Sequence, residues 1–587
     1  MLFYIQASGA ETNSKADAWR KEDMAVSPVR QENVFFEIGK GANCMKKAFC
    51  LMLCLALCLG CVSFAGAESA EKVHLTIVVK EDLLVEDWET NEMTRYLEEE
   101  GGFDLDFMVL PSKEYIEKLN MMVVDGGKDL PDIIMGTPSD AMLFSWAKAG
   151  AIIPLTKYYE DESLTPNIRE AWTRTGVDYR SQITQPDGEI YAIPSLNQSY
   201  GNEHPVKLFI YEPYLKALGM EVPTTTDELY ELLKAAVNTD LNGNGKRDEV
   251  GLIGTSLDGS TASEPSGWFQ AIMNSFVYAG DSNYFAVQDG KVGVAYNQEG
   301  WKKGLSYLAQ LYREGLIAPE SLTQDLTSFK ATFNAEDGAS FMMCFYTATG
   351  MLDGASPRKD EYIGIDPVAG PDGVAYITYR PSVASTRMMI TANCQNPEAA
   401  FRLGDLMSSE FIGISQRWGQ EGVDWDYIAD VDNPDDYEGM YELAGFDKYI
   451  ICYDDATFWA SGTPQNRSWR QQGPYVRQYA IANGQAMAKG SLKPQETMLA
   501  AYQYQLHNGT HNPAEVIPKL IYTSDESKIA SEKLNDLKIF VHETAANVIA
   551  GNIDIDEYWD AYLAELEMIG VNELVEVVQG VYDRMYK

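Results

Sequence analysis

One short, oxygen-rich segment contains the residues of this 587-residue chain whose types and spacing most clearly suggest chemistry. The residues are Asp240, Asn242, Asn244, Lys246, Asp248 and Glu249. Oxygen-bearing side chains at positions 1, 3 and 5, with glycine at position 6, are typical of the front half of a calcium loop, where position 7 contributes a backbone carbonyl. The segment departs from an EF-hand at position 12, where Gly251 replaces the bidentate glutamate. We expect a structural Ca²⁺ ion, with Asp248 and Glu249 closing its coordination sphere; the alternative is an Asn-Gly turn with a solvated acidic end.

Residue patterns for catalysis are not found in the sequence. The five histidines show no spacing typical of a metal site or of a catalytic pair; they are His74, His204, His507, His511 and His542. No GxSxG, HExxH, P-loop or GxGxxG motif occurs in the required strand–helix context. The many carboxylates leave a paired-acid glycoside hydrolase as the main enzymatic alternative.

Composition excludes one large class of partners. The chain has 46 Lys and Arg against 87 Asp and Glu, a formal net charge of −41, so it lacks the basic surface that binds nucleic-acid phosphates. Apolar residues make up 45% and charged residues 23%, which is typical of a folded globular protein. A chain of this length should form at least two domains or lobes.

The first part of the chain predicts an export signal. A lysine pair, the apolar run 48–60 and small residues ending at Ala67 follow the order of a secretory signal peptide. We expect residues 1–44 to be an unstructured gene-start extension and residues 45–67 to be the signal peptide. The mature protein would then be secreted or held at the cell surface. The alternative to cleavage after Ala67 is lipid attachment at Cys61.

Strands and helices alternate in the next segment. Strands are expected at 73–79, 103–110 and 132–135, and helices at 86–100, 113–124 and 140–149. Three strand–helix units predict a parallel sheet with helices on its faces, an α/β fold. Ligands bind such sheets at the carboxyl ends of strands, so Thr137 and Ser139 are candidate ligand residues; the alternative is an ordinary turn and helix cap.

Local signals predict further helices. Thr225 and Glu228 form a capping box for a helix over 226–237. Near the C-terminus, an apolar helical face ends at Gly570, and the same period restarts at Leu574. We therefore expect two packed C-terminal helices.

Five segments together resemble a known family. They are 186–254, 370–373 (GPDG), 396–410 (NPEAAFRLGDLMSSE), 418–425 (WGQEGVDW) and 549–587. In this order they are similar to the family 1 extracellular solute-binding proteins of ABC importers, in particular the LplA-like and alginate-oligosaccharide-binding branch. One departure is that many relatives have Arg-x-Asp-Trp where this chain has Tyr-Glu-Pro-Tyr at 211–214, so contacts of that arginine cannot be transferred.

The resemblance implies a two-lobed type II periplasmic binding protein fold, with hinge crossings and a ligand cleft. We expect lobe 1 to comprise 68–200, with a return and hinge at 339–395. Lobe 2 would comprise 201–338 and 396–587. The resemblance also implies that the oxygen-rich loop holds its calcium away from the cleft.

The implied function is delivery of a carbohydrate, expected to be an oligosaccharide, to the membrane permease subunits of an ABC transporter. The resemblance implies binding without catalysis, and we expect a monomer. Peptides or other polar solutes are alternative ligands, and a membrane sensor is an alternative partner. A secreted glycoside hydrolase is the enzymatic alternative.

Sugar recognition combines aromatic platforms for C–H faces with polar side chains for hydroxyls. Beside Thr137 and Ser139, the candidates are Trp268, Tyr346, Arg380, Trp418, Glu421, Trp425 and Trp459. Trp268 and Trp418 rank first because both lie beside glycine in loop-like sequence. The alternative for each aromatic residue is packing in the core, which helical patterns favour for Trp172 and Trp559.

Overall fold

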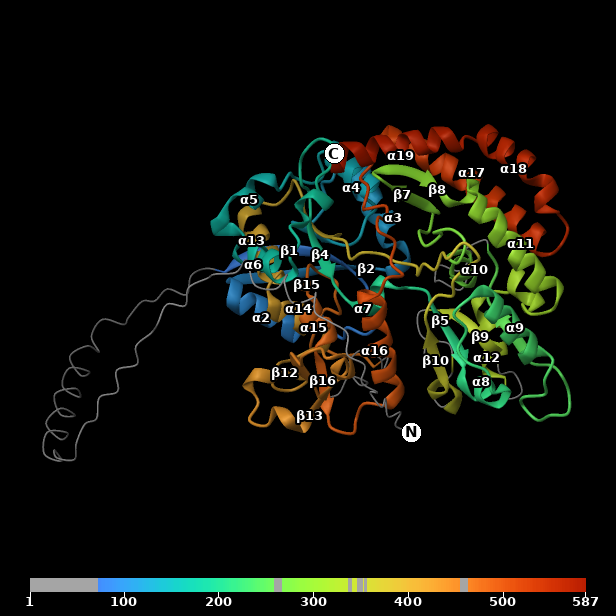
Figure 1. Ribbon diagram of the computed structural model, residues 1–587. Helices are drawn as coiled ribbons and strands as arrows, with labels where there is room; N and C mark the ends of the chain where they lie inside the picture. Colours follow the sequence, from blue (N-terminus) through green and yellow to red (C-terminus); the bar gives the residue numbers. More distant parts are fainter. Residues whose placement is uncertain (1–71, 258–266, 336–339, 346–351, 353–355, 454–462) are drawn as a thin grey trace, which may run out of the picture. The chain divides into compact units, whose positions relative to one another are not determined.

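The computed structural model describes residues 72–257, 267–335, 340–345, 352, 356–453 and 463–587 (Figure 1). The expected signal peptide, Cys61, Tyr346 and Trp459 lie outside the described residues. Residues 70–587 form one compact unit by their contacts. No helix in the described part of the chain is both long and apolar enough to cross a membrane.

A six-stranded sheet forms the centre of the first lobe, in the order β15-β4-β11-β3-β1-β2. The strands are β1 (Val73–Lys80), β2 (Phe103–Leu110), β3 (Ile133–Met135), β4 (Ile193–Asn197), β11 (Ser385–Ile390) and β15 (Val476–Arg477). β1 pairs in parallel with β2 and β3, which confirms the predicted arrangement of these three strands. β11 runs antiparallel to β3 and β4. This strand comes from a distant part of the chain, so local strand–helix patterns could not predict it.

Helices cover both faces of this sheet. They are α2 (Glu92–Gly101), α3 (Tyr115–Val124), α4 (Asp140–Lys148), α5 (Thr156–Glu160), α6 (Pro166–Thr175), α13 (Pro397–Met407) and α14 (Glu410–Trp418). The helix predicted over 86–100 begins only at Glu92, because the Asn91 side chain accepts a hydrogen bond from the Met93 amide and caps the helix there. α13 packs against α2 and α6.

A four-stranded sheet, in the order β10-β5-β9-β6, forms the centre of the second lobe. Its strands are β5 (Lys207–Tyr211), β6 (Val250–Ile253), β9 (Ser340–Phe345) and β10 (Tyr362–Ile365). Neighbouring helices in the sequence are α8 (Glu212–Leu218), α9 (Thr226–Val237), α10 (Gly267–Met273), α11 (Glu299–Arg313) and α12 (Leu326–Asn334). The bounds of α9 and its capping box are as predicted.

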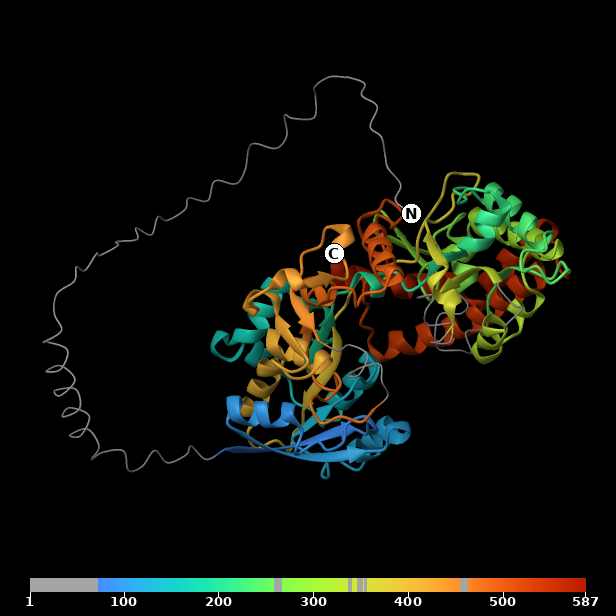
Figure 2. The same ribbon diagram turned by 90° about the horizontal axis from the view of Figure 1, so that it is seen from below.

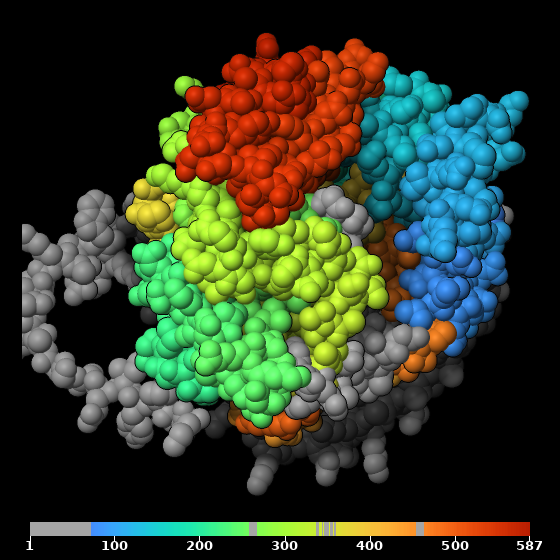
Figure 3. All heavy atoms as spheres, turned by 90° about the vertical axis from the view of Figure 1, so that its right-hand side faces the viewer, coloured from blue at the N-terminus to red at the C-terminus, as the bar shows by residue number. Residues whose placement is uncertain are grey.

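Three C-terminal helices complete the second lobe. They are α17 (Ser524–Ile549), α18 (Ile555–Ile569) and α19 (Val571–Tyr586). Gly570, in the left-handed region at φ 117°, separates α18 from α19 as predicted. α11 contacts α17 and α18, and Figures 1 and 2 show these helices side by side. In Figure 3 the red C-terminal helices lie against the yellow-green part of the chain.

Smaller elements complete the unit. A third sheet has the order β12-β14-β16-β13, formed by β12 (Trp425–Tyr427), β13 (Tyr437–Gly439), β14 (Ile450–Cys452) and β16 (Gln485–Ala488). β7 (Phe285–Gln288) and β8 (Lys291–Val294) form a hairpin. The short helix α7 (Tyr200–Glu203) lies between β4 of the first sheet and β5 of the second. The short helix α15 (Tyr479–Asn483) and the longer α16 (Pro494–Asn508) follow in sequence between β15 of the first sheet and the C-terminal helices.

Two expected lobe boundaries are wrong. β9 and β10 belong to the second sheet, so within 339–395 only β11 returns to the first lobe. α13 and α14 contribute Phe401, Met407 and Ile412 to the core that contains Leu75, so the first part of 396–587 is not in the second lobe. Periodicity identifies an amphipathic helix but does not say which sheet the helix covers, which explains the error.

Leu574 tests the packing of the C-terminal helices. Its side chain is 0% exposed in the core of the second lobe. We expect Leu574→Asp to lower the free energy of unfolding by about 3 kcal/mol or more, because the carboxylate would be buried without a partner. That loss corresponds to a melting temperature lower by about three degrees, measurable by calorimetry. The exposed neighbour Asn572 provides the control Asn572→Asp, and equal melting of the two variants would contradict the placement of α19.

Candidate functional site

The oxygen-rich loop lies between α9 and β6 and is folded around Asp240. The Asp240 carboxylate accepts hydrogen bonds from the amides of Gly243 (2.8 Å) and Gly245 (2.9 Å). Both glycines have positive φ, at 75° and 83°, which few other residues adopt without strain. The two glycines thus form the sharp turn that both the calcium-loop prediction and its alternative, an Asn-Gly turn, require.

Glu249 provides the test of whether a cation fits this loop. Its side chain is 7% exposed, and Oε1 accepts hydrogen bonds from the amides of Leu241 (2.5 Å) and Asn242 (3.0 Å). Its Oε2 is buried and has no hydrogen-bond partner among the described residues. A cation would neutralise this oxygen, so the residues fit such an ion. Within the described ranges, however, no three His, Cys, Asp or Glu side chains converge as a ready metal site.

The other loop side chains surround these two carboxylates. Asn242 and Asn244 each accept a backbone hydrogen bond through Oδ1, from the amides of Asn244 and Lys246. Asn244 also donates through Nδ2 to Asp248 (3.0 Å). The nearby phenol of Tyr214 has its pKa raised to about 12, first by burial and then by the charges of Glu249, Asp248 and Asp240. The loop is thus a local concentration of negative charge.

The two tryptophans of the WGQEGVDW segment are core residues. Trp418 is buried as the last residue of α14, and Gly419 ends the helix at φ 95°. Trp425 is fully buried in β12, and its indole N–H donates to the Gly419 carbonyl (2.9 Å). The expectation that Trp418 lies in a loop is therefore wrong, and neither indole presents a ring face for a ligand. Glu421, between them, is exposed.

Trp268 is also a core residue rather than a loop residue. It lies in α10, is 0% exposed, and donates through its indole N–H to the Thr255 carbonyl (2.8 Å). A Cβ atom at Gly254 would lie 1.9 Å from the Trp268 ring, so the glycine is required for this close packing. The glycine at 267 that suggested a loop instead begins the helix.

The remaining described candidates lie at the surface. Thr137 and Ser139 are exposed after β3, and Ser139 accepts a hydrogen bond from the Met142 amide (3.3 Å) as the N-cap of α4. The alternative of a turn and helix cap is therefore confirmed for Ser139. Arg380 is exposed, and its amide donates to the Glu203 carbonyl (2.8 Å).

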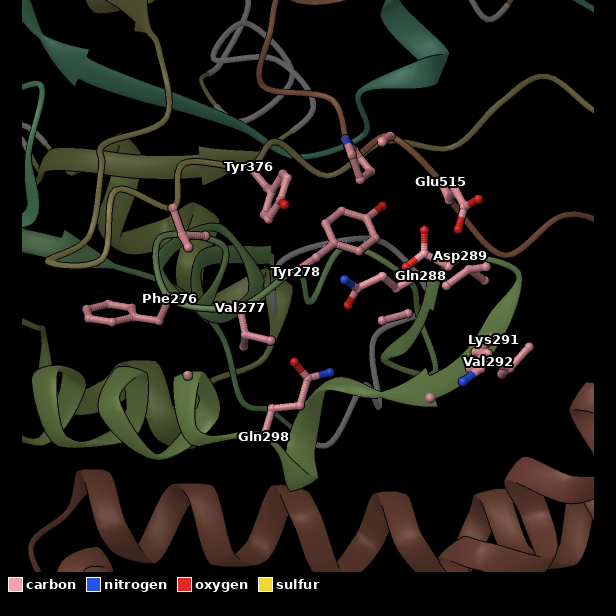
Figure 4. A pocket seen from close by; sticks show the side chains of 17 residues that line it. Phe276, Val277, Tyr278, Gln288, Asp289, Lys291, Val292, Gln298, Tyr376 and Glu515 are labelled. Atoms are coloured by element: carbon pink, nitrogen blue, oxygen red, sulfur yellow. The ribbon is translucent and has the colours of Figure 1, made fainter.

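Two tyrosines and two glutamines are among the residues that line one pocket, and we call it the tyrosine pocket (Figure 4). It has a volume of about 910 Å³. Tyr278 and Tyr376 meet edge to face with ring centroids 5.6 Å apart, and Gln288, Gln298 and Glu515 lie around the same space. Sequence reasoning missed both tyrosines, because neither stands in a motif and the segments that bring them together are about one hundred residues apart.

Arg380 lies in a neighbouring pocket of about 310 Å³ that shares Tyr278 with the tyrosine pocket. Asp281 also lines it and accepts hydrogen bonds through Oδ1 from the amides of Asn283 (2.8 Å) and Phe285 (3.2 Å). Burial raises the pKa of the Asp281 carboxyl, against the lowering effect of these hydrogen bonds and of the Arg380 charge. The ionised carboxylate is therefore disfavoured in the folded state.

A second cluster joins the segments that pass between the lobes. Glu203, at the end of α7, is 1% exposed and accepts hydrogen bonds from the Tyr479 hydroxyl and from His507 Nδ1 (2.6 Å). Burial and then Glu203 raise the pKa of Tyr479, so the phenol stays protonated and acts as the donor. The pattern of histidines gave no signal of this pair, because Glu203 and His507 are 304 residues apart in sequence.

Asp281→Asn tests the electrostatics of the Arg380 pocket. Because the folded-state pKa of Asp281 is raised, its contribution to stability is present at acidic pH and is lost as the pH rises through that pKa. Asparagine keeps an acceptor oxygen for both amides and removes the charge. We expect the melting temperature of the variant, relative to the wild type, to increase between pH 3.5 and pH 7. The exposed Asp129→Asn should show a smaller change, and equal pH profiles would contradict the assignment.

Comparisons with known proteins agree with this architecture. The model of the bacterial extracellular solute-binding protein family matches residues 83–410, more than half of the chain. The fructooligosaccharide ABC transporter substrate-binding protein FusA of Streptococcus pneumoniae is 26% identical over 508 residues, which cover 83% of this chain and 86% of FusA.

Solved structures share the fold. An extracellular solute-binding protein from Bifidobacterium longum subsp. infantis matches with a TM-score of 0.70 and 20% identity, over 88% of this chain and 99% of that one. An EF-hand mutant of FusA in complex with fructo-nystose matches with a TM-score of 0.61 and 22% identity, over 87% and 99%. The alginate-binding protein AlgQ2 without calcium ion matches with a TM-score of 0.59 and 20% identity, over 88% and 99%. The fold is thus the expected two-lobed α/β fold of periplasmic binding proteins, and this chain belongs to the bacterial extracellular solute-binding proteins of family 1.

Proposed function

We propose that this protein binds an oligosaccharide outside the cytoplasm and delivers it to the permease subunits of an ABC transporter. The observation that carries the proposal is the similarity to FusA, which extends over most of both chains and whose name specifies fructooligosaccharides. The pockets support it, because tyrosine rings beside amide and carboxylate side chains are suited to the C–H faces and hydroxyls of sugars.

We further propose which residues contact the ligand. Thr137, Ser139, Arg380 and Glu421 remain candidates because these residues are exposed. Tyr376, which is half-buried in the tyrosine pocket, is an additional aromatic candidate, whereas Tyr278 beside it is largely buried. Tyr346 and Trp459 remain candidates from sequence alone.

The location and state of the mature protein are part of the same proposal. Residues 45–67 would direct export, and the mature chain would be a monomer at the cell surface, free or attached through a lipid at Cys61. N-terminal sequencing of the exported protein would distinguish these possibilities. A first residue after Ala67 indicates cleavage, and a blocked, lipid-bearing cysteine indicates attachment.

Thermal unfolding with a panel of saccharides tests the ligand class. An oligosaccharide at 100 times its dissociation constant should add about 2.7 kcal/mol, which raises the melting temperature of a chain of this size by about two degrees. We expect fructooligosaccharides or related oligosaccharides to produce this shift without being hydrolysed. Shifts with peptides alone would contradict the proposal, and release of shorter sugars would favour a glycoside hydrolase.

Arg380→Ala connects that measurement to the site. We expect the variant to lose most of the saccharide-induced shift, which is measured from the variant's own ligand-free melting temperature because removal of the Arg380 charge also affects Asp281. The matched control is Arg402→Ala on α13, an exposed arginine paired with Glu398, and it should keep the full shift.

We also propose that the oxygen-rich loop binds a structural Ca²⁺ ion. Asp240, Asn242, Asn244, Asp248 and Glu249 would supply side-chain oxygens, and Lys246 its backbone carbonyl. The unpartnered, buried Glu249 Oε2 supports this, since a cation would compensate its charge. Two of the solved structures that share the fold, an EF-hand mutant of FusA and AlgQ2 without calcium ion, support the same type of site.

Removal of calcium tests this site independently of the sugar. We expect EGTA to lower the melting temperature by about two degrees relative to saturating Ca²⁺, with Mg²⁺ restoring less because it prefers fewer protein ligands. Asp240→Asn and Glu249→Gln should each remove the calcium-dependent increment. Glu231→Gln, an exposed change on the preceding helix α9, should retain it. An increment that survives in both loop variants would place any calcium elsewhere.

A further inference from the structure

A third pocket, of about 460 Å³, lies between α2, α14 and the turn that follows α14. We call it the carboxylate pocket, because Glu92 and Glu421 both line it. On its apolar side, the rings of Tyr96 and Phe411 stack with centroids 4.5 Å apart and planes at 30°. The pocket therefore combines an aromatic wall with two acidic side chains.

Among the described residues, two polar groups of this pocket have no hydrogen-bond partner. The Ser415 side chain is 3% exposed, and its Oγ makes no hydrogen bond. The Glu92 Oε2 is also buried without a partner. The position of Glu92 in the first turn of α2 compensates part of its charge through the helix dipole. Ser415 has no such compensation, and an unmade buried hydrogen bond is destabilising.

The charges that line the pocket determine which ligand charge would be favourable there. Among the described residues that line the pocket, Arg467 is the one basic residue, and it already forms an ion pair with Asp424. The pKa of Glu421 is raised first by partial desolvation in the pocket and then by the charges of Asp426 and Asp430, so two further carboxylates lie near it. A ligand that donates hydrogen bonds and carries a positive charge would relieve the resulting negative potential, whereas an anion would increase it.

We propose that the carboxylate pocket binds an amino sugar, with its ammonium group at Glu421 and Glu92, its ring against Tyr96 and a hydroxyl at Ser415. The choice of a sugar as the carrier of the ammonium group rests on the proposed carbohydrate function. A neighbouring pocket of about 430 Å³ shares Glu92 and Arg467 with this one, which leaves room for a second sugar residue.

Isothermal titration of the exported chain with glucosamine, glucose and N-acetylglucosamine tests the proposal. We expect glucosamine to bind at least about tenfold more tightly than the two neutral sugars, since a charge-assisted hydrogen bond is stronger than a neutral one. Glu421→Gln should weaken glucosamine binding about tenfold, because it removes the charge and keeps the shape. Glu99→Gln, an exposed change on α2 outside the pocket, should leave it unchanged.

Ser415→Ala gives a second, independent readout. The unpartnered hydroxyl contributes nothing to folding, so the variant should melt at the wild-type temperature or above it. It should nevertheless bind glucosamine a few-fold more weakly. Reduced melting with unchanged binding would show that Ser415 is a packing residue and would contradict its role as a contact.

Three further outcomes of these titrations and melting experiments would test the ammonium site and the proposed transport function separately. Equal affinity for glucosamine and glucose, or full binding by Glu421→Gln, would overturn the assignment of an ammonium site. Glucosamine binding without any oligosaccharide shift would uphold this pocket and contradict the proposed transport function. The opposite result is an oligosaccharide shift that persists in Glu421→Gln, with no glucosamine binding to the wild type. It would uphold the proposed transport function and contradict the assignment of this pocket.

Discussion

The structure depends on the fact that its chain passes between two hydrophobic cores, so neither lobe is continuous in sequence. Glu203 holds these passages together. Its carbonyl accepts from the Arg380 amide, and its buried carboxylate accepts from Tyr479 and His507. A buried carboxylate needs such partners, because leaving it unpaired costs more than the hydrogen bonds contribute. The positions of α7, α15 and α16 therefore depend on one another, because each helix contributes one side chain to these hydrogen bonds.

This dependence links the lobes to the candidate ligand residues. The Arg380 side chain lines a pocket, and its backbone amide donates to the Glu203 carbonyl. A ligand that contacts Arg380 would therefore contact a residue that is bonded directly to Glu203. Lys519 also joins segments from both lobes, through the Asp140 carboxylate (3.4 Å) and the Ala384 carbonyl (3.1 Å). A ligand that prefers one arrangement of these segments can shift their equilibrium only by its difference in affinity for the two arrangements.

Sequence reasoning succeeded where the structural cause is local. The capping box at Thr225 and Glu228 defines α9, and Gly570 separates two helices, because both signals act within a few residues. It failed where the cause is tertiary. Trp268 is adjacent to a glycine, but Gly254 brings the backbone close enough to bury the ring, and this contact has no local sequence signature. The Glu203–His507 pair and the return of β11 to the first sheet could not be predicted from the sequence for the same reason, since both join segments that are far apart in the chain.

The burial of Trp268, Trp418 and Trp425 changes how recognition must work in this protein. With these indoles in the cores, the aromatic side chains that line the described pockets include Tyr376, Tyr379 and the Tyr96–Phe411 pair. Tyrosines add a hydroxyl to each platform, so they can contact both the C–H face and the polar edge of a sugar. The acidic composition acts in the same direction, because carboxylates accept hydrogen bonds from hydroxyls and attract ammonium groups but repel anions. A ligand rich in donors is therefore favoured over a polyanionic one by the pockets and by the whole chain alike.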